Sequence, residues 1–273
     1  MYFGKMFFAV RTRRYLRMST RKFGLAVHAL ALVLVLANFA SAQSARPSST
    51  DGHLTAMRLD NVQIEAQGIR QLFSQLSLSY DIPIGLEIAS NDDEFARYAI
   101  DFKKGMLSDL LTQFVARHNQ YAWEIKDGTV SVFPNENYRD AVLDQILKAE
   151  IGSFSVRKNT SCWVFEKSLV STPEIKKILE ANGLTYNEVN FSGPYIPQLG
   201  RDFTLDVSNM TLKAILNKVI KESPTAKIWI IKRSDRRLLV KLSARHQDSP
   251  MRKENFVTPQ EKLYARARTG RYL

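Results

Sequence analysis

The stretch that decides the fold runs from Met106 to Phe133 and reads MLSDLLTQFVARHNQYAWEIKDGTVSVF. Its first half has the spacing of an amphipathic helix, with Leu107, Leu110, Leu111 and Phe114 on one face. Its second half alternates apolar and polar residues on both sides of Asp127-Gly128. This predicts a β-hairpin, because Asp-Gly accepts the positive φ angles of a tight turn. The stretch therefore predicts a helix packed beside paired strands.

A second copy of this pattern lies near the other end of the chain. Strand, helix and hairpin recur in the same order over residues 205–242, and the helix that begins at Leu107 recurs at Leu212. An earlier helical pattern that begins near Ile69 recurs at Ile175, at almost the same offset. The spacing predicts an internal repeat, which makes the expected fold α+β: two tandem small modules, each a short mixed sheet with two packed helices.

The repeat also sets the expected domain boundaries. The first module covers residues 58–136, with further strands predicted at Val62–Ile64, Ile82–Ile88 and Tyr98–Phe102. The second module covers residues 137–242 and carries a helical insertion at about residues 160–170. A flexible segment at residues 43–57 is expected before the modules, and a basic disordered tail at residues 243–273 after them.

The N-terminal segment, residues 1–42, has the pattern of a cleavable secretory signal. Seven Lys or Arg residues and no acid precede an apolar run from Leu25 to Phe39, which is too short to span a membrane as a helix. Ala40 and Ala42 then form a small-x-small cleavage site. Cleavage leaves an exported protein that begins at Gln43, periplasmic or secreted, and a start at Met18 would keep the signal complete.

Charge and cysteine content limit the function classes. The chain carries a net charge of +12, but the signal contributes +7 and the tail from Ser243 contributes +4. Residues 43–242 therefore have a net charge of only +1, which does not favour a nucleic-acid surface on the folded body. The single cysteine, Cys162, excludes an internal disulfide and is expected to be a buried apolar residue.

The first module resembles a known family. From Asn61 to Pro134, the order of apolar positions and the ending quoted above are similar to the secretin/TonB short N-terminal domain, and the second copy resembles it more loosely to Leu242. The usual glycine before the last hairpin is absent, since His118, Asn119 and Gln120 stand there. The segment after Leu242 is too short for a secretin pore or a receptor barrel. The resemblance thus implies the role of the small module alone, which docks other envelope proteins.

No catalytic set emerges from the residues. The histidines, His28, His53, His118 and His246, lack metal-ligand spacing, and neither a metal nor a cofactor is expected. Asp101 and Asp206 occupy equivalent strand positions, where outward-facing residues are the favoured interpretation over paired acid–base groups. Trp123 and Trp229 on the repeated hairpins are expected to pack in the core.

Two function classes remain open at this point. The favoured one is a non-enzymatic adaptor of the bacterial envelope that binds a protein partner, with β-augmentation at an exposed strand edge as one mode. The alternative is a cell-wall or carbohydrate-active enzyme with a scattered active site near residues 194–200. Nucleic-acid binding through the tail is a weaker third interpretation, and no membrane span is expected after signal cleavage.

Overall fold

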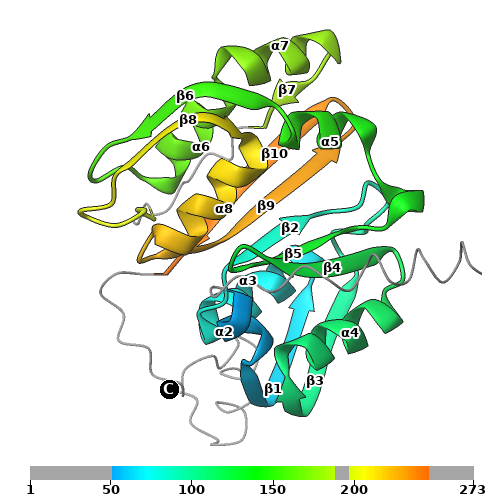
Figure 1. The fold of residues 1–273 in the computed structure, drawn as a ribbon. Helices are drawn as coiled ribbons and strands as arrows, with labels where there is room; N and C mark the ends of the chain where they lie inside the picture. The colour runs from blue at the N-terminus through cyan, green and yellow to red at the C-terminus, as the bar shows by residue number, and fades with distance from the viewer. Residues whose placement is uncertain (1–50, 188–196, 246–273) are drawn as a thin grey trace, which may run out of the picture. The chain divides into compact units, whose positions relative to one another are not determined.

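The computed structural model describes residues 51–187 and 197–245 (Figure 1). All of these residues belong to one compact unit. Its described residues form a mixed α+β fold, as the sequence predicts. The predicted cleavage residues Ala40 and Ala42 lie outside the described residues. No helix in the described ranges is long and apolar enough to cross a membrane.

The first copy contains the predicted helix and hairpin within a longer series of elements. A short helix α2 precedes the order strand, helix, strand, strand, helix and hairpin. The bounds are α2 Asp51–Thr55, β1 Arg58–Gln67, α3 Ile69–Tyr80, β2 Ile84–Glu87, β3 Arg97–Met106, α4 Leu107–Arg117, β4 Tyr121–Lys126 and β5 Thr129–Pro134.

The second copy repeats this order with one added helix, α6, at the predicted insertion. A short 3-10 helix at Glu136–Tyr138 leads into it. The bounds are α5 Ala141–Leu147, β6 Glu150–Val156, α6 Cys162–Val170, α7 Pro173–Ala181, β7 Thr185–Tyr186, β8 Leu205–Thr211, α8 Leu212–Glu222, β9 Ala226–Ser234 and β10 Arg237–Ala244.

Local chemistry explains where the repeated elements begin and turn. The Asp109 carboxylate accepts a hydrogen bond from the Met106 amide at 2.9 Å, and the Thr211 hydroxyl accepts one from the Ala214 amide at 3.2 Å. These bonds satisfy amide groups that a helix start leaves open. In the first hairpin, Asp127 and Gly128 have φ angles of 52° and 70°, as the predicted tight turn requires.

Strand pairing follows one plan in both copies. The first strand of each copy pairs antiparallel with the strand before the second helix, β1 with β3 and β6 with β8. The other strands form one six-stranded sheet in the order β4-β5-β2-β9-β10-β7. Each copy supplies three neighbouring strands to this sheet. Two of them form its hairpin, and the third is a short strand that pairs in parallel with the second strand of that hairpin. The two copies therefore share a sheet, an arrangement that the sequence alone did not predict.

The copies join where β2 pairs in parallel with β9, from Ile84 opposite Ile228 to Glu87 opposite Ile231. Alternate side chains of a strand point to opposite faces of its sheet. Ile228 and Ile230 accordingly lie in the first copy's core, while Trp229 and Ile231 lie in the second copy's core. All four of these β9 side chains are 0% exposed. Helices of the first copy thus cover one face of the joint, and helices of the second copy cover the other.

A glycine permits the close packing at this joint. Gly85 on β2 lies opposite Trp229, and a Cβ atom at Gly85 would lie only 2.3 Å from Cζ2 of that indole. The indole is fixed from the other side, because Trp229 Nε1 donates a hydrogen bond to Asn217 Oδ1 on α8 at 2.7 Å. The ring therefore has little freedom to move away from a larger residue at position 85.

Three sequence expectations need correction. The segment 43–57, expected to be flexible, contains helix α2, because Leu54 is buried in the first core and the Asp51 carboxylate accepts a hydrogen bond from the Gly128 amide at 2.6 Å. The tail begins later than Ser243, since β10 continues to Ala244. The strand predicted at Ile82–Ile88 is observed only over Ile84–Glu87, where it is buried on both faces between the two cores.

We predict that Gly85→Ala lowers the free energy of unfolding by about 1–3 kcal/mol, the usual cost of forcing extra atoms into a packed core. Urea unfolding of the mature chain measures the change. Gly52→Ala is the matched control, since a Cβ atom there meets nothing within 4 Å. Equal stability of the Gly85 variant and the control would contradict the tight packing against Trp229.

Candidate functional site

The candidate site is the outer edge of β4, the last strand at one end of the six-stranded sheet (Figure 1). β4 pairs antiparallel with β5 from Tyr121 to Lys126, and no other described strand pairs with it. A strand that pairs on one side presents N–H and C=O groups on the other, which is a template for a further strand. The edge thus has the chemistry to bind an extended peptide segment.

The second copy shows how this kind of edge is occupied. The hairpin turns place Asp127 of β4–β5 and Asp235 of β9–β10 at equivalent positions, both with positive φ. By this equivalence β9 is the counterpart of β4. The outer edge of β9 carries β2, and the Ile231 carbonyl accepts a hydrogen bond from the Ile88 amide at 2.9 Å just beyond the paired residues. The chain therefore contains one filled edge and one equivalent edge without a described strand partner.

Side chains are more deeply buried on the filled edge, β9, than on β4, which is the difference that an added strand produces. Trp229 and Ile231 on β9 are completely buried beneath the joint. Their counterparts on β4 are Tyr121, which is buried, and Trp123, which is only partly buried although it packs against the first core. The outer part of β4 therefore leaves some apolar surface accessible beside the open backbone groups.

Electrostatic pairing supports the filled edge. Among the described residues, four ion pairs join the two copies, and in each one the acid lies within residues 81–94 and the cation within residues 213–245. The pairs are Glu87–Lys213, Asp81–Lys227, Glu94–Lys232 and Asp81–Arg245. This one-way arrangement matches an acidic strand and its flanks to a basic edge, which favours a single register.

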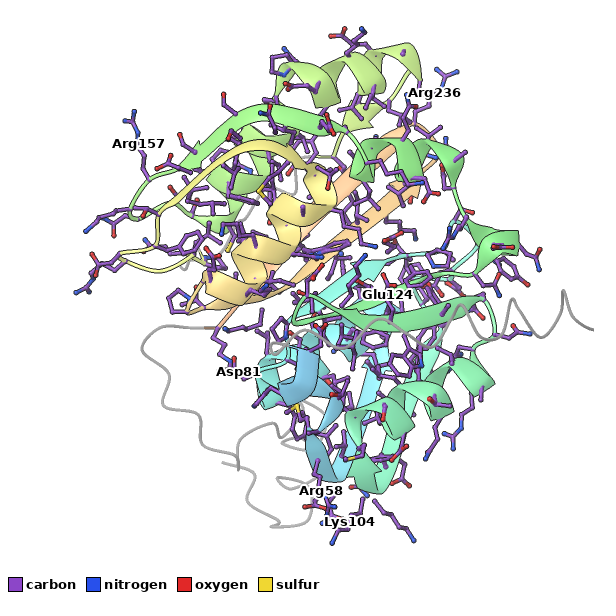
Figure 2. All side chains as sticks on the ribbon, in the orientation of Figure 1. Arg58, Asp81, Lys104, Glu124, Arg157 and Arg236 are labelled. Carbon is purple, nitrogen blue, oxygen red and sulfur yellow. The ribbon has the colours of Figure 1, made fainter. Side chains whose placement is uncertain are left out.

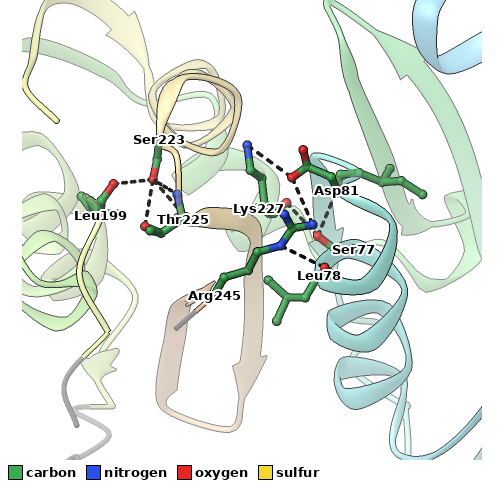
Figure 3. A network of polar contacts seen from close by, with 10 residues as sticks. Ser77, Leu78, Asp81, Leu199, Ser223, Thr225, Lys227 and Arg245 are labelled. Atoms are coloured by element: carbon green, nitrogen blue, oxygen red, sulfur yellow. Dashed lines mark hydrogen bonds and ion pairs between the residues drawn. The ribbon is translucent and has the colours of Figure 1, made fainter. Parts of the chain in front are cut away.

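The two best-defined groups of pairs differ in burial. The Glu87 side chain is 8% exposed and its carboxylate lies 2.9 Å from Lys213 Nζ; burial raises the pKa of Glu87, and the lysine partly opposes this. Asp81 ends α3 in a left-handed conformation and is 57% exposed, between Lys227 and Arg245 (Figure 3). The exposed contacts contribute little to stability, so the buried pair is the stronger determinant of register.

At one position the charge on the open edge is opposite to that on the filled one. Lys232 of β9 is buried and contacts Glu94 at 2.9 Å. Its counterpart on β4 is Glu124, which is exposed (Figure 2). A segment that binds beside β4 therefore meets a negative charge where β2 and its flanking loop meet a positive one.

The other end of the sheet is closed by the insertion. β7 pairs with β10 only at Thr185 and Tyr186, and helix α6 packs along β10 beyond them. Glu166 of α6 is 7% exposed, and its carboxylate accepts a hydrogen bond from the Leu242 amide at 2.6 Å. The insertion thus satisfies an edge group that a partner strand would otherwise use, as proteins do to protect edges.

A polar network holds the first residue of β4 in place. The Ala89 amide donates to the Tyr121 hydroxyl at 3.2 Å, and the Tyr98 hydroxyl donates to the buried Asp92 carboxylate. Burial raises the pKa of Asp92 and lowers the pKa of His118, whose ring packs against Tyr98 at 4.8 Å between centroids. These contacts position the loop after β2 and the edge strand together.

The remaining residues singled out from the sequence do not form an active site among the described residues. Asp101 and Asp206 are exposed and lie on separate two-stranded sheets. Cys162 is buried, and burial raises the pKa of its thiol to about 12, which disfavours the reactive thiolate. Trp229 is in the core, as expected. Within the described ranges, no group of three acids, histidines or cysteines is placed to hold a metal ion.

Sequence reasoning proposed an exposed edge but did not locate it. The available signal was the uninterrupted apolar run Ile228–Ile231, which is typical of a strand buried on both faces. This run predicts that β9 is an inner strand of the sheet. It does not predict that β2 is the neighbouring strand, because pairing between distant strands leaves no local pattern.

Comparison with known proteins adds no relative to this description. No protein-family model matches the chain, and searches of curated proteins and of solved structures find no significant match. The functional assignment therefore depends on the geometry above.

We predict that a Glu166→Gln variant becomes progressively more stable than the parent chain as pH rises from 5 to 8. Burial raises the pKa of Glu166 to about 7, above its usual 4.5. Between these values the unfolded chain releases a proton that the folded chain retains, so this group lowers stability as pH rises. Glutamine keeps an oxygen acceptor for the Leu242 amide but does not titrate.

Thermal unfolding of both proteins from pH 5 to 8 measures this difference. Groups common to the two chains cancel in the comparison. A stability difference that stays constant across the range would show that Glu166 does not titrate there.

Proposed function

We propose that this chain is an exported, non-enzymatic adaptor of the bacterial envelope that binds a protein partner through an open strand edge. The observation that carries the proposal is the pair of equivalent edges, β9 filled by β2 and β4 without a described strand partner. Main-chain hydrogen bonds at such an edge supply affinity, and the neighbouring side chains supply specificity.

Two further observations support the proposal. The order of elements in the first copy is the order implied by the resemblance to the secretin/TonB short N-terminal domain, a module associated with docking. The buried carboxyl groups with raised pKa values, Glu87, Asp92 and Glu166, are engaged in structural contacts rather than directed into a common cleft. Export, and with it a periplasmic or secreted location, follows from the signal pattern of residues 1–42.

We predict that the mature chain from Gln43, immobilised and incubated with an envelope extract of its native source, enriches a small set of envelope proteins. A second bait that ends at Arg245 keeps all of β10 and the Asp81–Arg245 pair, and we expect it to enrich the same proteins. Mass spectrometry quantifies the enrichment over an unrelated periplasmic protein of similar size.

Two results would count against the adaptor role. The first is no enrichment above the unrelated bait at low and physiological salt. The second is release of soluble fragments from purified cell wall by the mature chain, which would favour the cell-wall or carbohydrate-active enzyme instead.

A further inference from the structure

We propose that β4 accepts an extended segment of a partner protein in parallel orientation, and that this segment carries a lysine or arginine close to Glu124. This inference rests on the proposed adaptor function and specifies its edge, its orientation and the chemistry of its partner. The pairing of β2 with β9 is the template: it is parallel, it runs from Ile84 to Glu87, and it occurs on the strand equivalent to β4.

The hydrogen-bonding pattern identifies the groups that β4 offers. Lys126 and Thr129 flank a two-residue turn, so hydrogen-bonded pairs alternate with non-hydrogen-bonded pairs from that point along the hairpin. Trp123 and Ile125 fall in the non-hydrogen-bonded pairs and direct their N–H and C=O groups to the open side. Trp123 is the counterpart of Ile231, whose carbonyl accepts from Ile88 at the filled edge.

Self-assembly by repetition of the internal joint is disfavoured by the other end of the sheet. A copy added to β4 through its own β7 would offer only Thr185 and Tyr186, whereas β2 pairs over its whole length. Helix α6 and Glu166 cover the adjacent edge of β10. The two ends of the sheet are thus unequal: one is capped by α6, and the other carries no further strand among the described residues.

Charge disfavours a borrowed β2 strand from another copy. The segment around β2 brings Asp81, Glu87 and Glu94, each paired with a cation at the joint. On β4, Glu124 stands where β9 has Lys232, so the acidic flanks would meet a like charge. A partner segment with a cation near Glu124 and apolar residues toward Trp123 would instead pair with the Glu124 charge and cover the partly exposed indole.

The proposal is tested with a photoreactive amino acid, p-benzoylphenylalanine, placed at Glu124 or Lys126 of the full-length chain in living cells of its native source. Both side chains are exposed, so substitution leaves the core intact. The same amino acid at Gln63 on β1 and at Thr185 on β7 probes other exposed strands. Cross-linked peptides are sequenced by mass spectrometry.

We expect both β4 positions to cross-link to one stretch of a single envelope protein, with the lower yield at position 124, because the probe there removes the Glu124 charge. In parallel pairing, the attachment point for position 126 lies about two residues C-terminal to that for position 124, because paired strands advance together. Glu124→Lys should lower the cross-linking yield at position 126 roughly fivefold, since it replaces attraction with repulsion. Glu65→Lys, the same charge change on the exposed face of β1, should leave the yield unchanged.

The contrary outcomes separate this inference from the adaptor function. Capture from position 63 or 185 but not from β4 would overturn the β4 assignment and leave the adaptor role standing. Three results would each overturn the proposal. They are the reverse order of attachment points, attachment to another copy of this chain, and a cross-linking yield that Glu124→Lys leaves unchanged. Thermal unfolding of every variant verifies that a lost cross-link is not a lost fold.

Discussion

The parallel pairing of β2 with β9 is the constraint on which the rest of the molecule depends. It places Ile84–Glu87 of one copy against Ile228–Ile231 of the other and buries both strands on both faces. Removing that much apolar surface from water is the dominant favourable term in folding. The contact requires Gly85, since a larger residue would collide with Trp229, whose indole is hydrogen-bonded to α8. The copies are therefore parts of one folded unit rather than two independently folded modules.

Charge complements this packing by specifying the register. A shift of the strand would also separate Glu87 from Lys213 and leave a carboxylate buried without its cation. All four pairs described across the joint have the same polarity, with the acid from the first copy and the cation from the second.

The repeat explains why one edge remains a candidate for binding. Duplication of a module whose sheet has two edges creates a chain in which one inner pair of edges is joined and one outer pair is left. The second copy contains an insertion, α6, that closes its outer end through Glu166, whereas no described strand pairs with the outer edge of β4. Of the two ends of the described sheet, the β4 end is therefore the one suited to pair with a partner strand.

The sequence by itself determined the elements and their repetition. Apolar spacing predicted α4 and α8, the Asp127-Gly128 turn predicted the first hairpin, and the nearly constant offset between the two patterns predicted the second copy. The helix and hairpin signals depend on residues close together in the chain. Only the tertiary structure decided the shared sheet, the ordering of α2, the continuation of β10 and the difference between β4 and β9. Those features depend on contacts between residues far apart in the chain, such as Gly85 with Trp229, for which local periodicity carries no information.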